Sequence, residues 1–209
     1  MAEEYITAIE VIDHLLEEGL KDGSDGKYEP LLDAICVRVS RHVDNWFGYP
    51  AGAFKADTAT AKYFDGNGEV ELWPGYMAAA PTEVAVAEAG VLASLTTWDA
   101  ADYILRPNNS LAEGFPYRSL LIDLINGTKS RWANFPRAVK ITCQWGWSEE
   151  VPGPITEACV IQGARWFKRG QQAFQDAGAV TELMMMRYLK KIDPDVEMLL
   201  RMMPGGVTI

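Results

Sequence analysis

Residues 139–169 read VKITCQWGWSEEVPGPITEACVIQGARWFKR and carry three structural signals in direct succession. Apolar residues alternate with others over Ala138–Trp147, which predicts a strand ending in two tryptophans around Gly146. Pro152 and Pro154 then mark a turn. Apolar residues recur at helical spacing from Ile155 onward, and this helix closes on a basic cluster. The segment therefore predicts a change from β to α structure.

The helix from Ile155 carries an unusually wide apolar surface. At about 100° per residue its apolar and small residues cover about half of the circumference; they are Ile155, Cys159, Val160, Gly163, Ala164, Trp166 and Phe167. One neighbouring helix needs less than this. The helix is therefore either a central core helix or one that also packs against another subunit. Gly163 is expected to let a neighbour approach closely.

Two further helices are predicted near the N-terminus. Thr7 and Glu10 fit a capping box, and Ile6 and Val11 a hydrophobic staple, for a helix over Ala8–Glu18. Its inward residues are expected to be Ile12, Leu15 and Leu16. A polar linker follows over Gly19–Lys27. Pro30 then suits the first turn of a second helix that ends near Phe47. Its apolar stripe is Leu32, Ile35, Cys36, Val39, Val43 and Trp46.

The middle of the chain reads as β structure. Asp65-Gly-Asn-Gly68 lies between two strand patterns, Thr60–Phe64 and Glu69–Trp73, which predicts a hairpin. Further strands are predicted over Thr82–Glu88 and Thr96–Leu105, and Leu120–Ile125 is ambiguous.

The C-terminal region reads as two short helices. A methionine-rich helix is predicted from Thr181. Asp193 and Pro194 then suit the N-cap and first position of a last helix. The apolar residues of that helix are Val196, Leu199, Leu200, Met202 and Met203.

These elements predict one α+β domain over residues 1–209. Helices in 5–47 and 153–191 form a bundle. An antiparallel β-rich block over 58–148 is inserted between them, and an apolar C-terminal arm covers 192–209.

Charge is spread unevenly along the chain. The formal net charge is -10. Residues 1–100 hold 6 Lys and Arg against 18 Asp and Glu, whereas residues 101–209 hold 13 against 11. An acidic half argues against tight nucleic-acid binding and would repel DNA, although it also serves ordinary solubility. The acidic N-terminus and the lack of a long apolar run lead us to expect a cytoplasmic product without a membrane segment.

Catalytic and metal motifs are absent from the sequence. The 2 histidines form no metal-binding pattern, and no phosphate-binding glycine loop or nucleophile elbow occurs. Asp65, Asn67 and Glu69 alternate as in a calcium loop, but Tyr76 stands where a glutamate is required. The 3 cysteines are widely spaced and read as buried thiols. We therefore expect no enzyme, cofactor or metal; the alternative is a hydrolase that uses the many carboxylates.

Two side-chain groups allow more than one interpretation. Alternation would put Trp145 and Trp147 on one face, either as core residues or as a sugar-stacking platform. Arg165, Lys168 and Arg169 form a solvated helix face, a set of intersubunit ion pairs or a phosphate contact.

Taken in order, these motifs resemble the head–tail connector (adaptor) family of long-tailed bacteriophages. The resemblance covers most of the chain: Thr60–Gly68 with Leu72, Pro81 with Val84, Tyr103–Pro107, Pro116–Tyr117, Phe135–Pro136, Val139–Thr142, Trp145–Trp147, Val151–Pro152, Ile155, Arg165–Arg169 and Asp193–Leu200. The chain departs from the family at Cys143 or Gln144, where glycine is common, and it lacks a basic C-terminal tail.

The resemblance implies a structural protein of the virion neck, made in the host cytoplasm. It implies a ring of twelve identical subunits that joins the portal, extends the DNA channel and carries the stopper or tail-terminator protein. We expect the subunit contacts and fold hinge at Trp145, Trp147, Ile155, Val160, Arg165, Trp166, Phe167 and Arg169. The portal-docking arm is expected at Val196, Leu199, Leu200, Met202 and Met203. The competing function is a carbohydrate-binding module with an aromatic platform.

Overall fold

The computed structural model describes residues 4–17, 28–87, 94–175 and 192–203. The chain divides into two compact units. A β unit spans Ala53–Glu150, and a helical unit contains the chain before and after it. The mixed α+β class predicted from the sequence is confirmed, with helices from both ends of the chain in one bundle.

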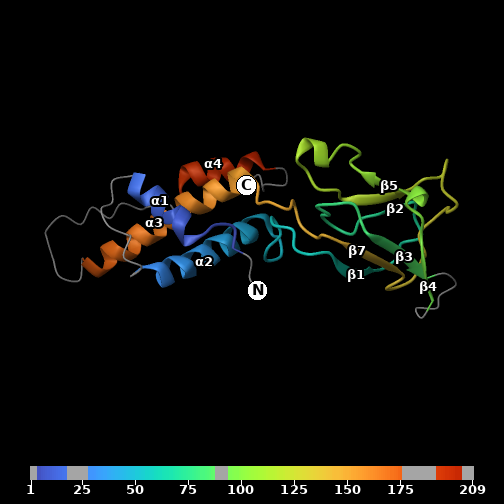
Figure 1. The fold of residues 1–209 in the computed structure, drawn as a ribbon, viewed down its shortest axis with the longest axis horizontal. Coiled ribbons are helices and arrows are strands. Elements are labelled where there is room, and N and C mark those ends of the chain that lie inside the picture. Colours follow the sequence, from blue (N-terminus) through green and yellow to red (C-terminus); the bar gives the residue numbers. More distant parts are fainter. Residues whose placement is uncertain (1–3, 18–27, 88–93, 176–191, 204–209) are drawn as a thin grey trace. The chain divides into compact units, whose positions relative to one another are not determined.

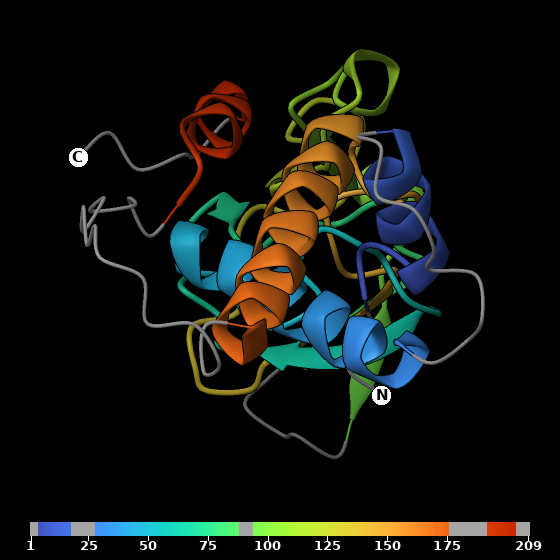
Figure 2. The ribbon, with the colours of Figure 1, turned by 90° about the vertical axis from the view of Figure 1, so that its left-hand side faces the viewer.

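The helical unit is built around one central helix. Its helices are α1 (Ala8–Glu17), α2 (Glu29–Phe47), α3 (Gly153–Gln175) and α4 (Pro194–Met202). α3 contacts each of the other three. Figure 2 shows α3 lying beside both α1 and α2. The helix predicted from Thr181 lies outside the described residues, as does nearly all of the linker predicted over Gly19–Lys27.

The predicted capping box starts α1. The amide of Thr7 donates to Glu10 Oε2 over 2.6 Å, and the amide of Glu10 donates to Thr7 Oγ1 over 3.4 Å. Ile6 and Val11 are buried, as a hydrophobic staple requires. Leu15 is also buried, but Leu16 is 45% exposed, so its predicted inward position is wrong. Val11 and Leu15, one turn apart, form the buried side of this helix.

The sequence pattern of α2 is largely confirmed. Pro30 lies in its first turn, and Gly48 closes it in the left-handed conformation at φ 70°. The stripe of Leu32, Ile35, Cys36, Val39 and Val43 is buried, whereas Trp46 is half-buried.

The wide apolar arc of α3 is used inside the helical unit. Ile155, Cys159, Val160 and Phe167 are all buried there. Three neighbouring helices account for an arc wider than one helix needs. Gly163 does not mark a close approach, because an added Cβ would lie 3.5 Å from Val11 Cγ2, an ordinary van der Waals distance.

The β unit consists of two antiparallel sheets (Figure 1). The first has the order β1-β7-β3-β4, with β1 at Thr60–Phe64, β7 at Val139–Cys143, β3 at Glu83–Ala87 and β4 at Leu95–Thr97. The second has the order β2-β6-β5, with β2 at Glu71–Leu72, β6 at Ser119–Ile122 and β5 at Tyr103–Arg106. Two short 3-10 helices, η2 (Ala100–Asp102) and η3 (Leu111–Glu113), lie in the connections.

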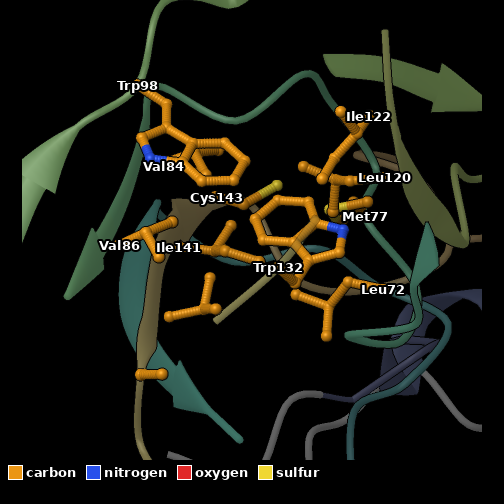
Figure 3. Packing of buried hydrophobic residues seen from close by; sticks show 12 residues of the cluster. Leu72, Met77, Val84, Val86, Trp98, Leu120, Ile122, Trp132, Ile141 and Cys143 are labelled. Atoms are coloured by element: carbon orange, nitrogen blue, oxygen red, sulfur yellow. The ribbon is translucent and has the colours of Figure 1, made fainter. Parts of the chain in front are cut away.

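A single apolar cluster joins the two sheets. Leu72, Leu120 and Ile122 come from the second sheet, and Val84 and Ile141 from the first. Figure 3 shows the Trp132 ring between these groups. Trp132 is fully buried and stacks on Trp98 with the ring centroids 4.7 Å apart. The large aromatic residues thus fill the space between the sheets.

The predicted hairpin over residues 60–73 is wrong. β1 pairs with β7 in the first sheet, and β2 pairs with β6 in the second. The turn between β1 and β2 bonds instead to a distant loop, because the amides of Gly66 and Gly68 donate to Phe135 O and Ala133 O. A Cβ on Gly66 would lie 1.8 Å from Ala133 O, so this glycine is required for close backbone approach.

The single strand predicted over Thr96–Leu105 is also wrong. The chain leaves the first sheet after Thr97, turns through η2 and enters the second sheet at Tyr103. Asp99 caps η2 by accepting from the Ala101 amide, and Asp102 Oδ2 accepts from the Asp99 amide. This capping box interrupts the strand pattern.

Candidate functional site

The two tryptophans of the opening segment lie beyond the end of β7, and Trp145 packs against β1. Its Nε1 donates to Thr60 O over 2.8 Å. Its ring centroid lies 5.4 Å from that of Phe64, and Lys62 Nζ lies 4.6 Å from the ring. Trp145 is half-buried and has aromatic and cationic neighbours already.

Trp147 packs in a different aromatic group. Its neighbours are Phe54, Tyr76 and Phe115, with ring centroids 5.7, 5.3 and 6.3 Å away. Trp147 is only 4% exposed. The two indoles therefore do not form a shared, open face of the kind that stacks on a sugar ring, and core packing is the better account of Trp147.

Gly146 is fixed by its backbone and its neighbours together. Its φ is 146°, a conformation that side chains disfavour, and a Cβ would lie 2.8 Å from Ala56 Cα. Its amide donates to Tyr76 O over 3.1 Å. The Trp-Gly-Trp pattern is thus a structural requirement of the β unit.

The chain enters and leaves the β unit through paired segments. The Trp147 amide donates to Ala53 O over 2.9 Å, and the Ala56 amide donates to Ser148 O over 2.7 Å. These bonds hold the two ends of the β unit together.

The chain passes from the helical unit to the β unit between Gly52 and Ala53. On the helical side of this point, the buried carboxylate of Asp44 accepts hydrogen bonds and forms an ion pair. It accepts from the Gly52 amide over 3.1 Å and from the Tyr5 hydroxyl, and it pairs with Arg41 at 2.8 Å. Hydrogen bonds and an ion pair of this kind offset the cost of burying a carboxylate. Gly52 is therefore held by the helical unit, and Ala53 is held by the β unit.

The structure places the expected subunit-contact residues in separate surroundings. Trp145 and Trp147 belong to the β unit. Ile155, Val160 and Phe167 lie in the core of the helical unit. Arg165 forms an ion pair with Asp193, and the Trp166 ring lies 5.6 Å from that of His42. Arg165, Trp166 and Arg169 are half-buried.

The expected docking arm is partly packed on its own unit. Val196, Leu200 and Met203 are buried, Leu199 is half-buried and Met202 is 63% exposed. Asp193 holds the start of α4, because it caps the Asp195 amide and also pairs with Arg165. The last part of the expected arm, residues 204–209, lies outside the described chain.

The side-chain chemistry of the described residues gives little support to catalysis. Burial raises the pKa of the Cys36 thiol to about 12 and that of Cys143 to about 11, which disfavours the reactive thiolate. Hydrogen bonds from Lys140, from the Thr128 amide and from the Asn126 amide lower the pKa of Glu83, Asp102 and Asp123 respectively. A general acid working near neutral pH needs a raised pKa instead.

The residues that resembled a calcium loop have structural roles. Asp65 Oδ1 accepts from the Arg137 amide, and Asn67 Oδ1 accepts from the Glu69 amide. Within the described ranges, no group of three potential metal ligands converges. Likewise, none of the helices that the structure describes has the length and hydropathy to cross a bilayer.

Sequence reasoning missed an exposed apolar loop in the β unit. Leu124 is 62% and Ile125 is 90% exposed. Asp123 Oδ1 accepts from the amides of Ile125 and Asn126, so this loop is ordered around its aspartate. The apolar residues up to Ile125 were visible in the sequence, and Asp123 among them was a local turn signal for the end of the strand at Ile122.

A hollow of about 340 Å³ lies beside β5. Its lining residues include Pro81, Tyr103, Leu105 and Tyr117. Burial, and secondarily the charge of Asp99, raises the pKa of Tyr103, so this phenol stays neutral. The lining supplies no group suited to nucleophilic chemistry.

Comparison with known proteins shows a structural likeness. No protein family and no curated protein matches the sequence. The fold is similar to a chain from the neck of an empty GTA particle computed with C6 symmetry, with a TM-score of 0.53 and 15% identity over 95% of this chain and 88% of that one. A chain from the virion of a native gene transfer agent (GTA) particle has a TM-score of 0.47 and 16% identity over the same shares. At such low identity, the first likeness shows a shared fold.

Proposed function

We propose that this protein is a structural component of the neck of a phage-like particle, a head–tail connector. The main observation in support is the fold shared with a GTA neck chain, which extends over 95% of this chain and 88% of that one. The ordered sequence motifs independently resemble the connector family. Both lines lead to the same part of a virion.

The proposed assembly is a closed ring of identical subunits beneath the portal. The similar neck was computed with C6 symmetry, which suits a ring of six or twelve copies. We favour twelve, as the family resemblance implies. The ring would extend the DNA channel and carry the stopper or tail-terminator protein. The excess of acidic residues in the N-terminal half would keep passing DNA from adhering.

We assign the portal contact to the outward side of α4. Val196, Leu200 and Met203 are occupied by packing on the protein itself. Met198 and Met202 are 55% and 63% exposed and lie four residues apart, on one helical face. Flexible methionine side chains suit contact with a partner surface.

The direct test combines the purified full chain with portal rings of the same particle. Negative-stain images should show an added ring below the portal. The double variant Met198→Glu/Met202→Glu should abolish this ring density while leaving the circular dichroism spectrum unchanged. Ile9→Glu, on an equally exposed residue of α1, is the matched control and should still assemble.

Two outcomes would separate the parts of the proposal. A ring that forms normally with the methionine variant would overturn the portal assignment alone. No added density with the native chain would overturn the connector function. The carbohydrate-binding alternative gains no specific support, because Trp147 is buried and Lys62 Nζ lies over the Trp145 ring.

A further inference from the structure

The first sheet of the β unit is open at both edges. β1 and β4 each pair with one strand only among the described residues (Figure 1). β1 is exposed along Thr60–Tyr63, and Thr96 and Thr97 of β4 are exposed. Unpaired strand edges are ready sites for pairing with another chain unless they are covered or carry charges.

Hydrogen bonds fix which residues of β1 face its open side. The Ala87 amide donates to Ala138 O, just before β7, and the Thr82 amide donates to Thr142 O, so Ala138 and Thr142 turn their backbone groups toward β3. The amides and carbonyls of successive residues point to alternate sides of a strand. Residues 139, 141 and 143 therefore direct their backbone groups toward β1. Their partners are Phe64, Lys62 and Thr60. Ala61 and Tyr63 therefore direct their amides and carbonyls outward.

The same reasoning applies to β4. The Trp98 amide donates to Val84 O over 2.8 Å, and Thr96 pairs with Val86. Trp98 and Thr96 thus turn toward β3, so Leu95 and Thr97 direct their backbone groups outward. Each open edge presents two outward residues separated by one inward residue.

The opposite directions of β1 and β4 make these two edges complementary. All three pairings in this sheet are antiparallel, so β1 and β4 run in opposite directions. If a second copy continues the sheet in the same orientation, its β4 runs antiparallel to β1 of the first. The other sheet has three strands, and its edges β2 and β5 run in the same direction. Of the two sheets in the described residues, only the four-stranded one continues as an antiparallel sheet.

Neither edge carries a charge at its outward positions. Ala61, Tyr63, Leu95 and Thr97 are uncharged, and Tyr63 is 49% exposed. The lysine of β1, Lys62, is on the opposite face of the strand and lies over Trp145. The edges thus lack the outward lysine that commonly prevents strand addition.

We propose that neighbouring copies of this chain join by antiparallel addition of β4 of one copy to β1 of the next. In the register given by the outward residues, Ala61 lies opposite Thr97 of the next copy, and Tyr63 lies opposite Leu95. Such a head-to-tail contact uses two different edges, and it closes into a ring when the rotation between copies allows. This inference rests on the proposed function and identifies the contact between its subunits.

Disulfide trapping in assembled rings tests this register. In Ala61→Cys/Thr97→Cys, the paired Cα atoms should lie about 5.5 Å apart, within disulfide range. Mild oxidation should give a ladder of covalent oligomers that collapses on reduction. Cys36, Cys143 and Cys159 are buried and can remain. Ala61→Cys alone, and Ala61→Cys/Thr96→Cys with the second thiol on the other face, should stay monomeric on denaturing gels.

A proline variant supplies the second measurement. Ala61→Pro removes an outward amide that the protein itself does not use in the β1–β7 pairing, so the monomer should keep its circular dichroism spectrum and lose ring formation. Lys62→Pro removes an inward donor and should unfold β1 instead.

The possible results separate the inference from the proposed function. Rings that form without the ladder, or that form with Ala61→Pro, would overturn the strand-addition contact and leave the connector function standing. A native chain that forms no ring, even with portal, would overturn both.

Discussion

Trp147 and Trp73 have the same side chain in the same unit and differ in burial, 4% against 66% exposed. Replacing a buried tryptophan by alanine removes packing and leaves a cavity, at a cost of about 3–5 kcal/mol. We expect Trp147→Ala to lower the free energy of unfolding by this amount in urea titrations, and to impair ring assembly through folding. Trp73→Ala should change it by less than about 0.5 kcal/mol. A folded, assembling Trp147→Ala protein would contradict the structural role.

His42 gives the helical unit a pH dependence. Burial lowers the pKa of His42 from its ordinary 6.5, and its Nε2 is buried with no hydrogen-bond partner among the described residues. The unfolded state therefore binds a proton at a higher pH than the folded state does. The contribution of neutral His42 to the free energy of unfolding is fully present above pH 6.5 and is lost as the pH falls.

The measurement is the urea midpoint between pH 7.5 and 5.5. The native protein should lose stability over this range, and His42→Gln should reduce the slope. An unchanged slope in the variant would assign the effect to other groups.

At the scale of single residues, the sequence predicted those features that depend on residues close together in the chain. The Thr7–Glu10 box and the Pro30 position follow from short-range hydrogen bonding and backbone geometry, and both were predicted. The separate aromatic neighbours of Trp145 and Trp147 depend on Phe64 and Phe54, which are far away in the sequence, so the pattern of residues 139–147 could not distinguish them.

Among the elements, α3 offers a stabilising substitution. Gly163 lies inside the helix, and an added Cβ would meet Val11, Ile35 and Ile6 at 3.5–3.7 Å without overlap. Glycine within a helix costs about 0.5–1 kcal/mol relative to alanine. Gly163→Ala should therefore raise the free energy of unfolding by about that amount. Destabilisation would show that the surrounding helices cannot accept the methyl group.

The attachment of α4 depends on Asp193. This residue caps the helix, pairs with Arg165, and donates its amide to Gln162 Oε1. Removing an N-cap costs about 0.5–2 kcal/mol. Asp193→Ala should increase hydrogen exchange in α4, because the cap and the ion pair are lost together. Glu197→Ala, which removes only the surface pair with Arg201, is the control and should leave the exchange nearly unchanged.

Element types were predicted better than their partners. The strand patterns of β3 and β7 were recognised, but the Asp65–Gly68 turn suggested a local hairpin that does not form. Its glycines serve contact with residues 133–135, which no local rule reveals. The end of the strand after Thr97 did have a local signal, because Asp99 and Asp102 have the spacing of a capping box. The alternation of apolar residues over 96–105 obscured that signal.

At the scale of the whole molecule, the β unit has the features of an independently folding part. It has its own core around Trp132, and hydrogen bonds between residues 53–56 and 147–148 hold its ends together. We therefore expect a fragment covering Ala53–Glu150 to fold alone. The stacked Trp98–Trp132 pair should give it a coupled indole signal in circular dichroism, and Trp132→Ala should remove that signal. Amide NMR resonances confined to the narrow range of unfolded chains would contradict this expectation and show that the helical unit is required.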